Sequence, residues 1–172
     1  MKLETLEDVF VEQIADLYSA EQQLVQALPK MVQAAHSDEL RKAFSEHLEE
    51  TKGHLTRLEE IKSHASKAIP VETCQAMKGL IQEGEEVIEA QGDGAALDAA
   101  LIAAAQRVEH YEIAGYRTAK TLADQLGYDR AEELLDETLD EESKADKLLT
   151  KIATGGFLSS GVNQEAAGQN GG

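Results

Sequence analysis

Apolar side chains recur every three or four residues along most of the chain, which is the period of a helix with one buried face. Short breaks containing Ser, Asp, Gly or Pro separate these stretches. The pattern predicts five helices, over about 3–35, 38–63, 73–90, 95–126 and 129–153. No segment alternates with a period of two, so we expect no strand.

Several helix ends carry recognisable signals. Ser37 or Asp38 can cap the second long helix, because a short polar side chain accepts from free backbone N–H groups there. Gly127 is well placed to end the fourth helix. Asp129 followed by Glu132 resembles a capping box at the start of the last one.

Four long helices and one short one predict an all-α, antiparallel four-helix bundle made of two helical hairpins. The short helix, 73–90, forms the crossover between the hairpins, and the bundle domain spans residues 1–154. Six of the last 18 residues are Gly, with Ser, Asn and Gln among them. Such a segment buries too little apolar surface to order itself, so we expect a flexible tail over 155–172.

Charge and composition narrow the partners. The chain has 172 residues, with 16 Lys and Arg against 33 Asp and Glu, a formal net charge of −17. This excess repels phosphate and anionic lipid, so we expect neither nucleic acid nor a membrane as a partner. The single cysteine, Cys74, excludes an intrachain disulfide or a cysteine-based metal cluster and favours a reducing, cytoplasmic setting.

Acidic side chains interrupt the apolar stripes of all four long helices. Together with one histidine, the residues on or beside these stripes are Glu21, Glu50, His54, Glu109, Glu112, Glu142 and Asp146. Glu21 lies 16 residues before the first hairpin turn, at Ser37, and Glu50 lies 13 after it. Around the second turn, Glu112 and Glu142 each lie 15 residues from Gly127. Offsets of three residues or fewer correspond to about 4.5 Å along a helix, so we expect these glutamates at one level of the bundle.

The two hairpins also resemble each other. Residues 48–52 (LEETK) match 140–144 (DEESK), and comparable glutamates recur 91 and 92 residues apart. This faint internal repeat indicates a pseudo-two-fold axis through the middle of the bundle.

A cluster of buried carboxylates is costly, by several kcal/mol for each ion removed from water. Protonation or bound cations must relieve the repulsion. Two divalent cations bridged by glutamates would nearly neutralise the cluster, and oxygen ligands with an imidazole suit iron or manganese. The sequence therefore predicts a centre of two metal ions, with iron favoured and manganese or a mixed pair as the alternatives.

The chain resembles the YciF-type ferritin-like proteins of bacteria, which are relatives of rubrerythrin and ferritin. The resemblance covers about 3–153 and is carried by residues 6–10 (LEDVF), 18–24 (YSAEQQL), 47–51 (HLEET), 99–106 (AALIAAAQ) and 108–114 (VEHYEIA). It implies a five-helix ferritin-like fold, a rubrerythrin-like di-metal site, a homodimer and a link to bacterial stress responses.

The resemblance also implies ligands. Glu21 matches the single glutamate of the family's first helix, and Glu50 that of the second. Glu109 and Glu112 match the paired glutamates of rubrerythrin's third long helix, and Glu142 matches the glutamate of the last.

The histidine positions depart from the superfamily. Its Glu-x-x-His elements would need histidine at two positions that here hold Gly53 and Ala145. His54 stands one residue late on the second helix, His47 is a second candidate there, and the last helix offers only Asp146. We therefore expect a centre richer in carboxylates and poorer in nitrogen.

Two main classes of function remain open, and a third, a lipid- or acyl-binding bundle, is disfavoured because the charges on the apolar stripes argue against an apolar tunnel. The first is a stress-associated, non-haem di-iron or iron–manganese protein that reacts with dioxygen or peroxide, as a ferroxidase or peroxidase would. The alternative is a metal-free helical interaction or scaffold module with a partly hydrated acidic core. A rubrerythrin-style electron chain is disfavoured because the sequence has no Cys-x-x-Cys pair.

Overall fold

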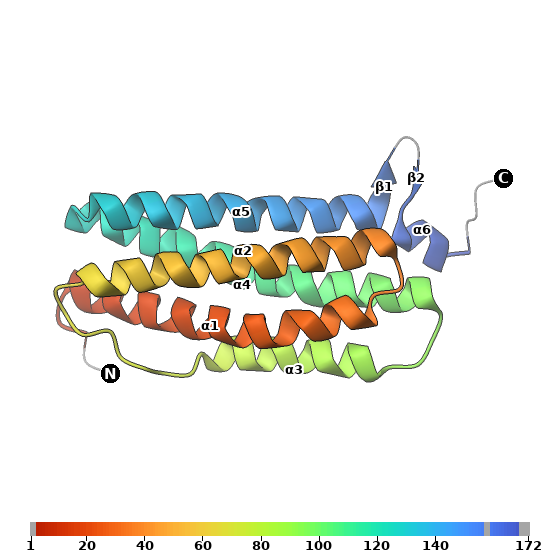
Figure 1. Cartoon of the computed structure of the whole chain (residues 1–172), viewed down its shortest axis with the longest axis horizontal. Coiled ribbons are helices and arrows are strands. Elements are labelled where there is room, and N and C mark those ends of the chain that lie inside the picture. The colour runs from red at the N-terminus through yellow and green to blue at the C-terminus, as the bar shows by residue number, and fades with distance from the viewer. Residues whose placement is uncertain (1–2, 157–158, 169–172) are drawn as a thin grey trace.

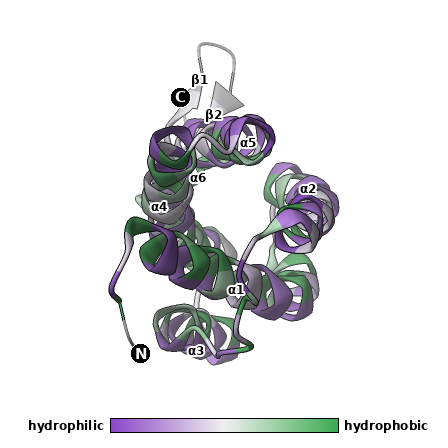
Figure 2. Ribbon diagram, turned by 90° about the vertical axis from the view of Figure 1, so that its left-hand side faces the viewer, coloured by the Kyte–Doolittle hydropathy of each residue, from purple (hydrophilic) through white to green (hydrophobic). Residues whose placement is uncertain are grey.

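Four long helices lie side by side as two antiparallel hairpins in the computed structural model, which describes residues 3–156 and 159–168 (Figure 1). The helices are α1 (Leu6–Ala34), α2 (Asp38–His64), α4 (Gly94–Leu126) and α5 (Asp129–Thr154). The short α3 (Gln75–Glu89) packs on the outside of α1 and α4 (Figure 2). This arrangement confirms the ferritin-like bundle with a crossover helix, and none of the described helices is long and apolar enough to cross a membrane.

The helix ends follow local chemistry with one exception. The Ser37 hydroxyl accepts from the backbone N–H of Leu40 and caps α2. Gly127 ends α4 in the left-handed conformation, with φ of 70°, which glycine adopts without steric cost. The capping box expected at Asp129 is wrong, because Asp129 is already helical and Tyr128 precedes it without a side-chain cap.

The segment after α5 carries more local structure than the sequence predicts. Strand β1 (Gly155–Gly156) pairs antiparallel with β2 (Ser159–Ser160), and α6 (Val162–Ala166) packs against α4 and α5. The expectation of no strand is wrong here, because strands of two residues are too short to show any period. Val162 is buried, and a Cβ on Gly161 would lie 2.2 Å from the backbone nitrogen of Gly155. Flexibility of this tail stays a prediction, and its residues 157–158 and 169–172 lie outside the described residues.

The apolar core is divided into two halves along the bundle. One half gathers around Leu28, Phe44 and Ile152, near the turn between α1 and α2. The other gathers around Phe10 and Leu135, toward the opposite end. On each long helix the residues between the two halves include buried polar side chains, and these form the candidate site.

Candidate metal centre

All four long helices send ionisable side chains into the layer between the two apolar halves. Glu21 comes from α1, Glu109 and Glu112 from α4, and Glu142 from α5, and none of them is more than 3% exposed. Helix α2 contributes two buried histidines instead of a glutamate. The expected level of these glutamates is confirmed for Glu21 and Glu142, which belong to one group of adjacent atoms.

The first group consists of Glu21, His54 and Glu142, whose nearest ligand atoms all lie within 4.8 Å of one another. The Nδ1 atom of His54 lies 3.1 Å from Oε1 of Glu21 and 3.0 Å from Oε1 of Glu142. These spacings leave one imidazole nitrogen and two carboxylates facing a common point.

The second group consists of His47, Glu109 and Glu142, again within 4.8 Å. The Nε2 atom of His47 lies 3.3 Å from Oε1 of Glu109 and 3.8 Å from Oε2 of Glu142. Glu142 therefore presents one oxygen to each group, which is the arrangement of a carboxylate that bridges two cations.

Buried atoms without a hydrogen-bond partner are concentrated in this layer. Such an atom costs about 1–3 kcal/mol, and more when charged, so native proteins contain few of them. Among the described residues, every such side-chain atom belongs to Glu21, His47, Glu109, Glu112 or Glu142, and both oxygens of Glu112 are included. Glu112 is fully buried and interacts electrostatically with the glutamates of both groups, but it belongs to neither group.

In each histidine, the ring nitrogen that does not face the metal group contacts a carboxylate outside that group. The Nε2 atom of His54 lies 3.0 Å from Oε2 of Glu141, and the Arg57 guanidinium donates to both oxygens of Glu141 at 2.6 and 3.0 Å. The Nδ1 atom of His47 lies 3.4 Å from Oε2 of Glu50. Metal-ligating histidines characteristically have such a partner, which fixes the ring and the tautomer.

The structure also places a buried tyrosine at the site. Tyr116 donates its hydroxyl hydrogen to Oε1 of Glu21, and its ring lies edge-on to the ring of His54, with centroids 6.1 Å apart. Tyr116 was not predicted from the sequence, although it follows Glu112 by four residues and so shares its helix face. Glu141 was not predicted either, because it sits in an acidic run that resembles a solvated face.

Two expected site residues lie elsewhere. The buried position expected for Glu50 is wrong: its side chain is 46% exposed, because it sits about 60° around the helix from His47, at the edge of the stripe. Asp146 faces α4, where it accepts from Nε2 of Gln106 at 2.9 Å and lies 3.3 Å from Nε2 of His110. Neither Glu50 nor Asp146 belongs to the two groups.

Burial governs protonation of the clustered carboxyls. Loss of water raises the pKa of Glu109 and Glu112 well above the ordinary 4.5. Burial also raises the pKa of Glu21, against the opposing effect of its hydrogen bond with His54. For Glu142, burial acts upward, but its contacts with the histidines prevail and lower its pKa.

Neighbouring carboxylates favour the protonated form of both histidines in the metal-free protein. Burial alone would lower the pKa of His47, but the charge of Glu109 and the hydrogen bond with Glu50 outweigh it and raise the value to about 10. Burial likewise opposes protonation of His54, but hydrogen bonds, that with Glu141 foremost, raise its pKa to about 12. Because a metal binds the deprotonated ring, metal binding here displaces protons.

These shifts predict how the stability of the metal-free protein depends on pH. The stabilising contribution of protonated His47 is complete below pH 6.5 and is lost as the pH rises through about 10. The hydrogen bond with His54 is the main cause that lowers the pKa of Glu141 from 4.5 to about 2. The stabilising contribution of ionised Glu141 is therefore present above pH 4.5 and lost as the pH falls toward 2. We expect the melting temperature of chelator-treated protein to be highest between about pH 4.5 and 6.5, and to fall toward pH 2 and toward pH 10. Metal-loaded protein should lose the alkaline decline, and a flat alkaline arm without metal would contradict these protonation states.

The contact between Glu141 and His54 gives a second prediction. Glu141→Gln should weaken metal affinity about 10–100-fold, while saturating metal still fills both positions, because Glu141 orients a ligand without being one. Titration against a competing chromogenic chelator measures this. Glu137→Gln is the matched control, since Glu137 is 58% exposed and also contacts Arg57. Equal affinities in the two variants would contradict the role of Glu141.

The fold and the layer of acids and histidines define a ferritin-like helical bundle protein with a candidate di-metal centre. The family described as "Domain of unknown function (DUF892)" matches residues 5–167, and the chain belongs to this family. Protein YciF of Escherichia coli (strain K12) is 50% identical over 154 residues, which cover 89% of this chain and 93% of that protein. The resemblance to YciF-type proteins is therefore confirmed.

Solved structures agree with this assignment. The crystal structure of the E. coli stress protein YciF matches with a TM-score of 0.84 over 87% of this chain and 94% of that chain, at 50% identity. YcfI from Rhodopseudomonas palustris, described as a candidate structural protein, matches with a TM-score of 0.84 and 38% identity over 88% of this chain and 97% of that chain. A Xanthomonas campestris protein with 19% identity and a TM-score of 0.67, covering 86% of this chain and 89% of that chain, shows the shared fold alone.

Proposed function

We propose that the chain is a di-metal carboxylate protein that holds two divalent cations between its four long helices. Glu21 and His54 would hold one ion and His47 and Glu109 the other, with Glu142 bridging them. Glu112 supplies a further carboxylate beside them. The observation that carries the proposal is the concentration of unpartnered buried ligand atoms in this single layer.

Charge balance supports two ions. The four buried glutamates carry four negative charges when ionised, and two divalent cations supply four positive ones. Glu141 does not enter this sum, because Arg57 already pairs with it at 2.6 Å. The mixture of carboxylate oxygen and imidazole nitrogen suits iron first, with manganese or a mixed pair as alternatives.

Iron bound here would supply one-electron redox chemistry toward dioxygen or peroxide. The residues of the chain hold and shield the site. Glu141 orients the imidazole of His54 and Glu50 that of His47, and Tyr116 donates a hydrogen bond to Glu21. The apolar halves of the core exclude water on both sides of the site. We propose a ferroxidase- or peroxidase-like activity, and the description of E. coli YciF as a stress protein supports a stress-associated role.

The test is metal content followed by reaction. Metal-free protein titrated anaerobically with Fe²⁺ should bind two ions per chain. Exposure to dioxygen or peroxide should then oxidise the iron faster than it oxidises in buffer. Protein that binds no Fe²⁺ or Mn²⁺ at micromolar concentration would contradict the proposal.

A metal-free scaffold or interaction module is the second candidate. The description of the R. palustris relative as a candidate structural protein favours it, and two protonated histidines would partly neutralise the acids without metal. It predicts protein purified without metal whose stability is unchanged by added Fe²⁺. The homodimer and cytoplasmic setting stay predictions in either case.

A further inference from the structure

A narrow opening between α2 and α5 connects the surface with the second metal group. It is a cavity of about 90 Å³, and its lining includes His47 and Glu109, which are 6% and 3% exposed. Its outer rim carries the exposed Glu46, Glu50 and Lys144. Two residues of the second metal group therefore line the inner part of the opening, and charged side chains line its mouth.

The inner end points to a cation. Both Nε2 of His47 and Oε2 of Glu109 are buried without a hydrogen-bond partner. By contrast, a larger cavity of about 290 Å³, beside Phe10 and Tyr128, is lined by no member of either metal group. Of these two cavities, only the small opening is lined by residues of a metal group.

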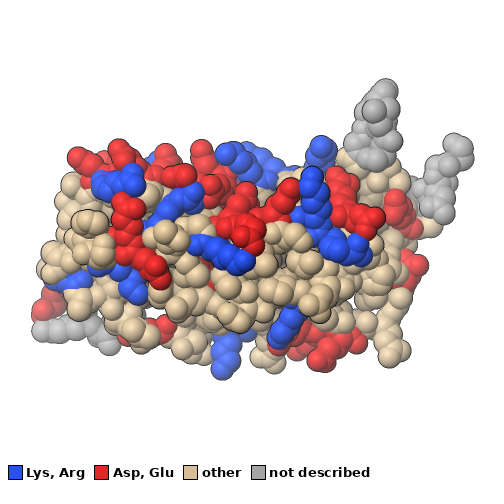
Figure 3. Space-filling view, in the orientation of Figure 1, with Lys and Arg blue, Asp and Glu red and all other residues tan. Residues whose placement is uncertain are grey.

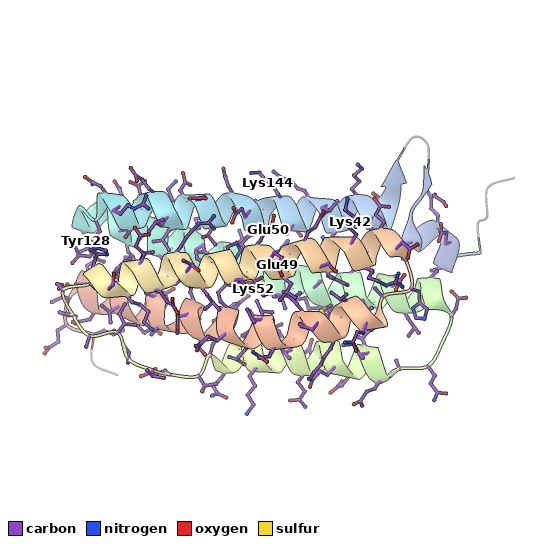
Figure 4. The ribbon with its side chains drawn as sticks, viewed as in Figure 1. Lys42, Glu49, Glu50, Lys52, Tyr128 and Lys144 are labelled. Carbon is purple, nitrogen blue, oxygen red and sulfur yellow. The ribbon has the colours of Figure 1, made fainter. Side chains whose placement is uncertain are left out.

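Glu50 links the mouth to the site. Its side chain is 46% exposed, yet Oε2 lies 3.4 Å from Nδ1 of His47, whose other nitrogen faces Glu109. Figure 4 shows Glu50 and Lys144 at the same position along the bundle, on the helices that flank the opening. Lys and Arg side chains lie among Asp and Glu on this face (Figure 3). The rim itself carries both signs, with Glu46 and Glu50 against Lys144, so it combines attraction and repulsion for a cation.

We propose that this opening is the access route of the divalent cations, and that Glu50 attracts them at its mouth. The inference rests on the proposed function and deepens it. A cation would move from the carboxylates of Glu46 and Glu50 toward Nε2 of His47 and the carboxylate of Glu109. Lys144, on the other rim, slows the passage by its positive charge.

The experiment is the rate of Co²⁺ uptake by metal-free protein, followed by visible absorbance after rapid mixing. Glu50→Gln should load about 3- to 10-fold more slowly at low ionic strength, and salt should shrink the difference, because steering by charge is screened. Lys144→Gln should load faster than wild type. Final Co²⁺ content should stay at two per chain in Lys144→Gln and in Glu46→Gln. Glu46→Gln removes a negative charge from the rim while Glu50, the partner of His47, stays in place, and it should slow loading in the same salt-dependent way.

Matched controls lie on α2, the helix that carries Glu50. Glu49 and Lys52 pair with each other at 2.6 Å, are exposed, and do not line the opening. Glu49→Gln and Lys52→Gln change the net charge of the protein by the same amounts as the test variants. Their loading rates should equal that of wild type.

The outcomes separate the possible failures. Equal rates in Glu49→Gln and Glu50→Gln would overturn the access route. Slow loading in Glu50→Gln alone, with the wild-type rate in Glu46→Gln, would assign the effect to the orientation of His47 and overturn the role of Glu50 at the mouth. Wild-type protein that binds no Co²⁺ would contradict the proposed function itself, and the access route with it.

Discussion

Saturating Mn²⁺, or Fe²⁺ without air, should raise the melting temperature of the metal-free protein by roughly 15–30 °C. A ligand at about a thousand times its Kd adds about 4 kcal/mol to the free energy of unfolding, so two such ions add about 8 kcal/mol. For a domain of this size about 1 kcal/mol corresponds to about 2–4 °C. Relief of repulsion among the buried carboxylates is the physical source of the gain.

Thermal unfolding followed by circular dichroism measures this rise after chelation and stepwise addition of metal. Mg²⁺ is the control ion, because it prefers oxygen ligands and gives up its water reluctantly. The rise should stop at two equivalents of Mn²⁺. Equal small shifts with Mg²⁺ and Mn²⁺ would indicate screening of charge instead of a specific site.

Glu142→Gln should abolish the binding of both ions. Its two oxygens face different groups, Oε1 toward His54 and Oε2 toward His47, so one substitution removes a ligand from each. We expect metal content to fall from two ions per chain to well below one. Elemental analysis after desalting measures the content, and circular dichroism checks that the helices remain.

Asp140→Asn is the matched control for this prediction. Asp140 lies two residues earlier on α5, is exposed, and loses the same charge on substitution. It should retain two ions per chain. If Glu142→Gln also retains two, Glu142 does not bridge the ions, and the arrangement proposed for the centre is wrong.

The sequence predicted the helices and the level of the acidic layer because both follow from spacing along a helix. Its helix ranges agree with α1 to α5 to within a few residues, and Gly127 ends α4 as expected. Glu21 and Glu142 were placed correctly because they stand midway between residues of the apolar stripe. The residues that lie opposite them in the bundle could be predicted only from the number of residues between each glutamate and its hairpin turn.

The rest depends on packing between helices. Glu50 and Thr51 are neighbours on α2, and the packing of the other helices against α2 leaves Thr51 buried and Glu50 exposed. His47 likewise faces Glu109 on α4 and Glu142 on α5, which its own helix does not reveal. Glu141 could not be distinguished from its acidic neighbours, because its role comes from Arg57 and His54 on another helix.

Anomalous X-ray diffraction at the absorption edge of iron or manganese tests the central claim most directly, using crystals grown with that metal. Two peaks should appear in the middle of the bundle, both in contact with Glu142. One should also contact Glu21 and His54, and the other His47 and Glu109. Crystals from metal-containing solution with no peak in this layer, and with His54 still hydrogen-bonded to Glu21, would contradict the account.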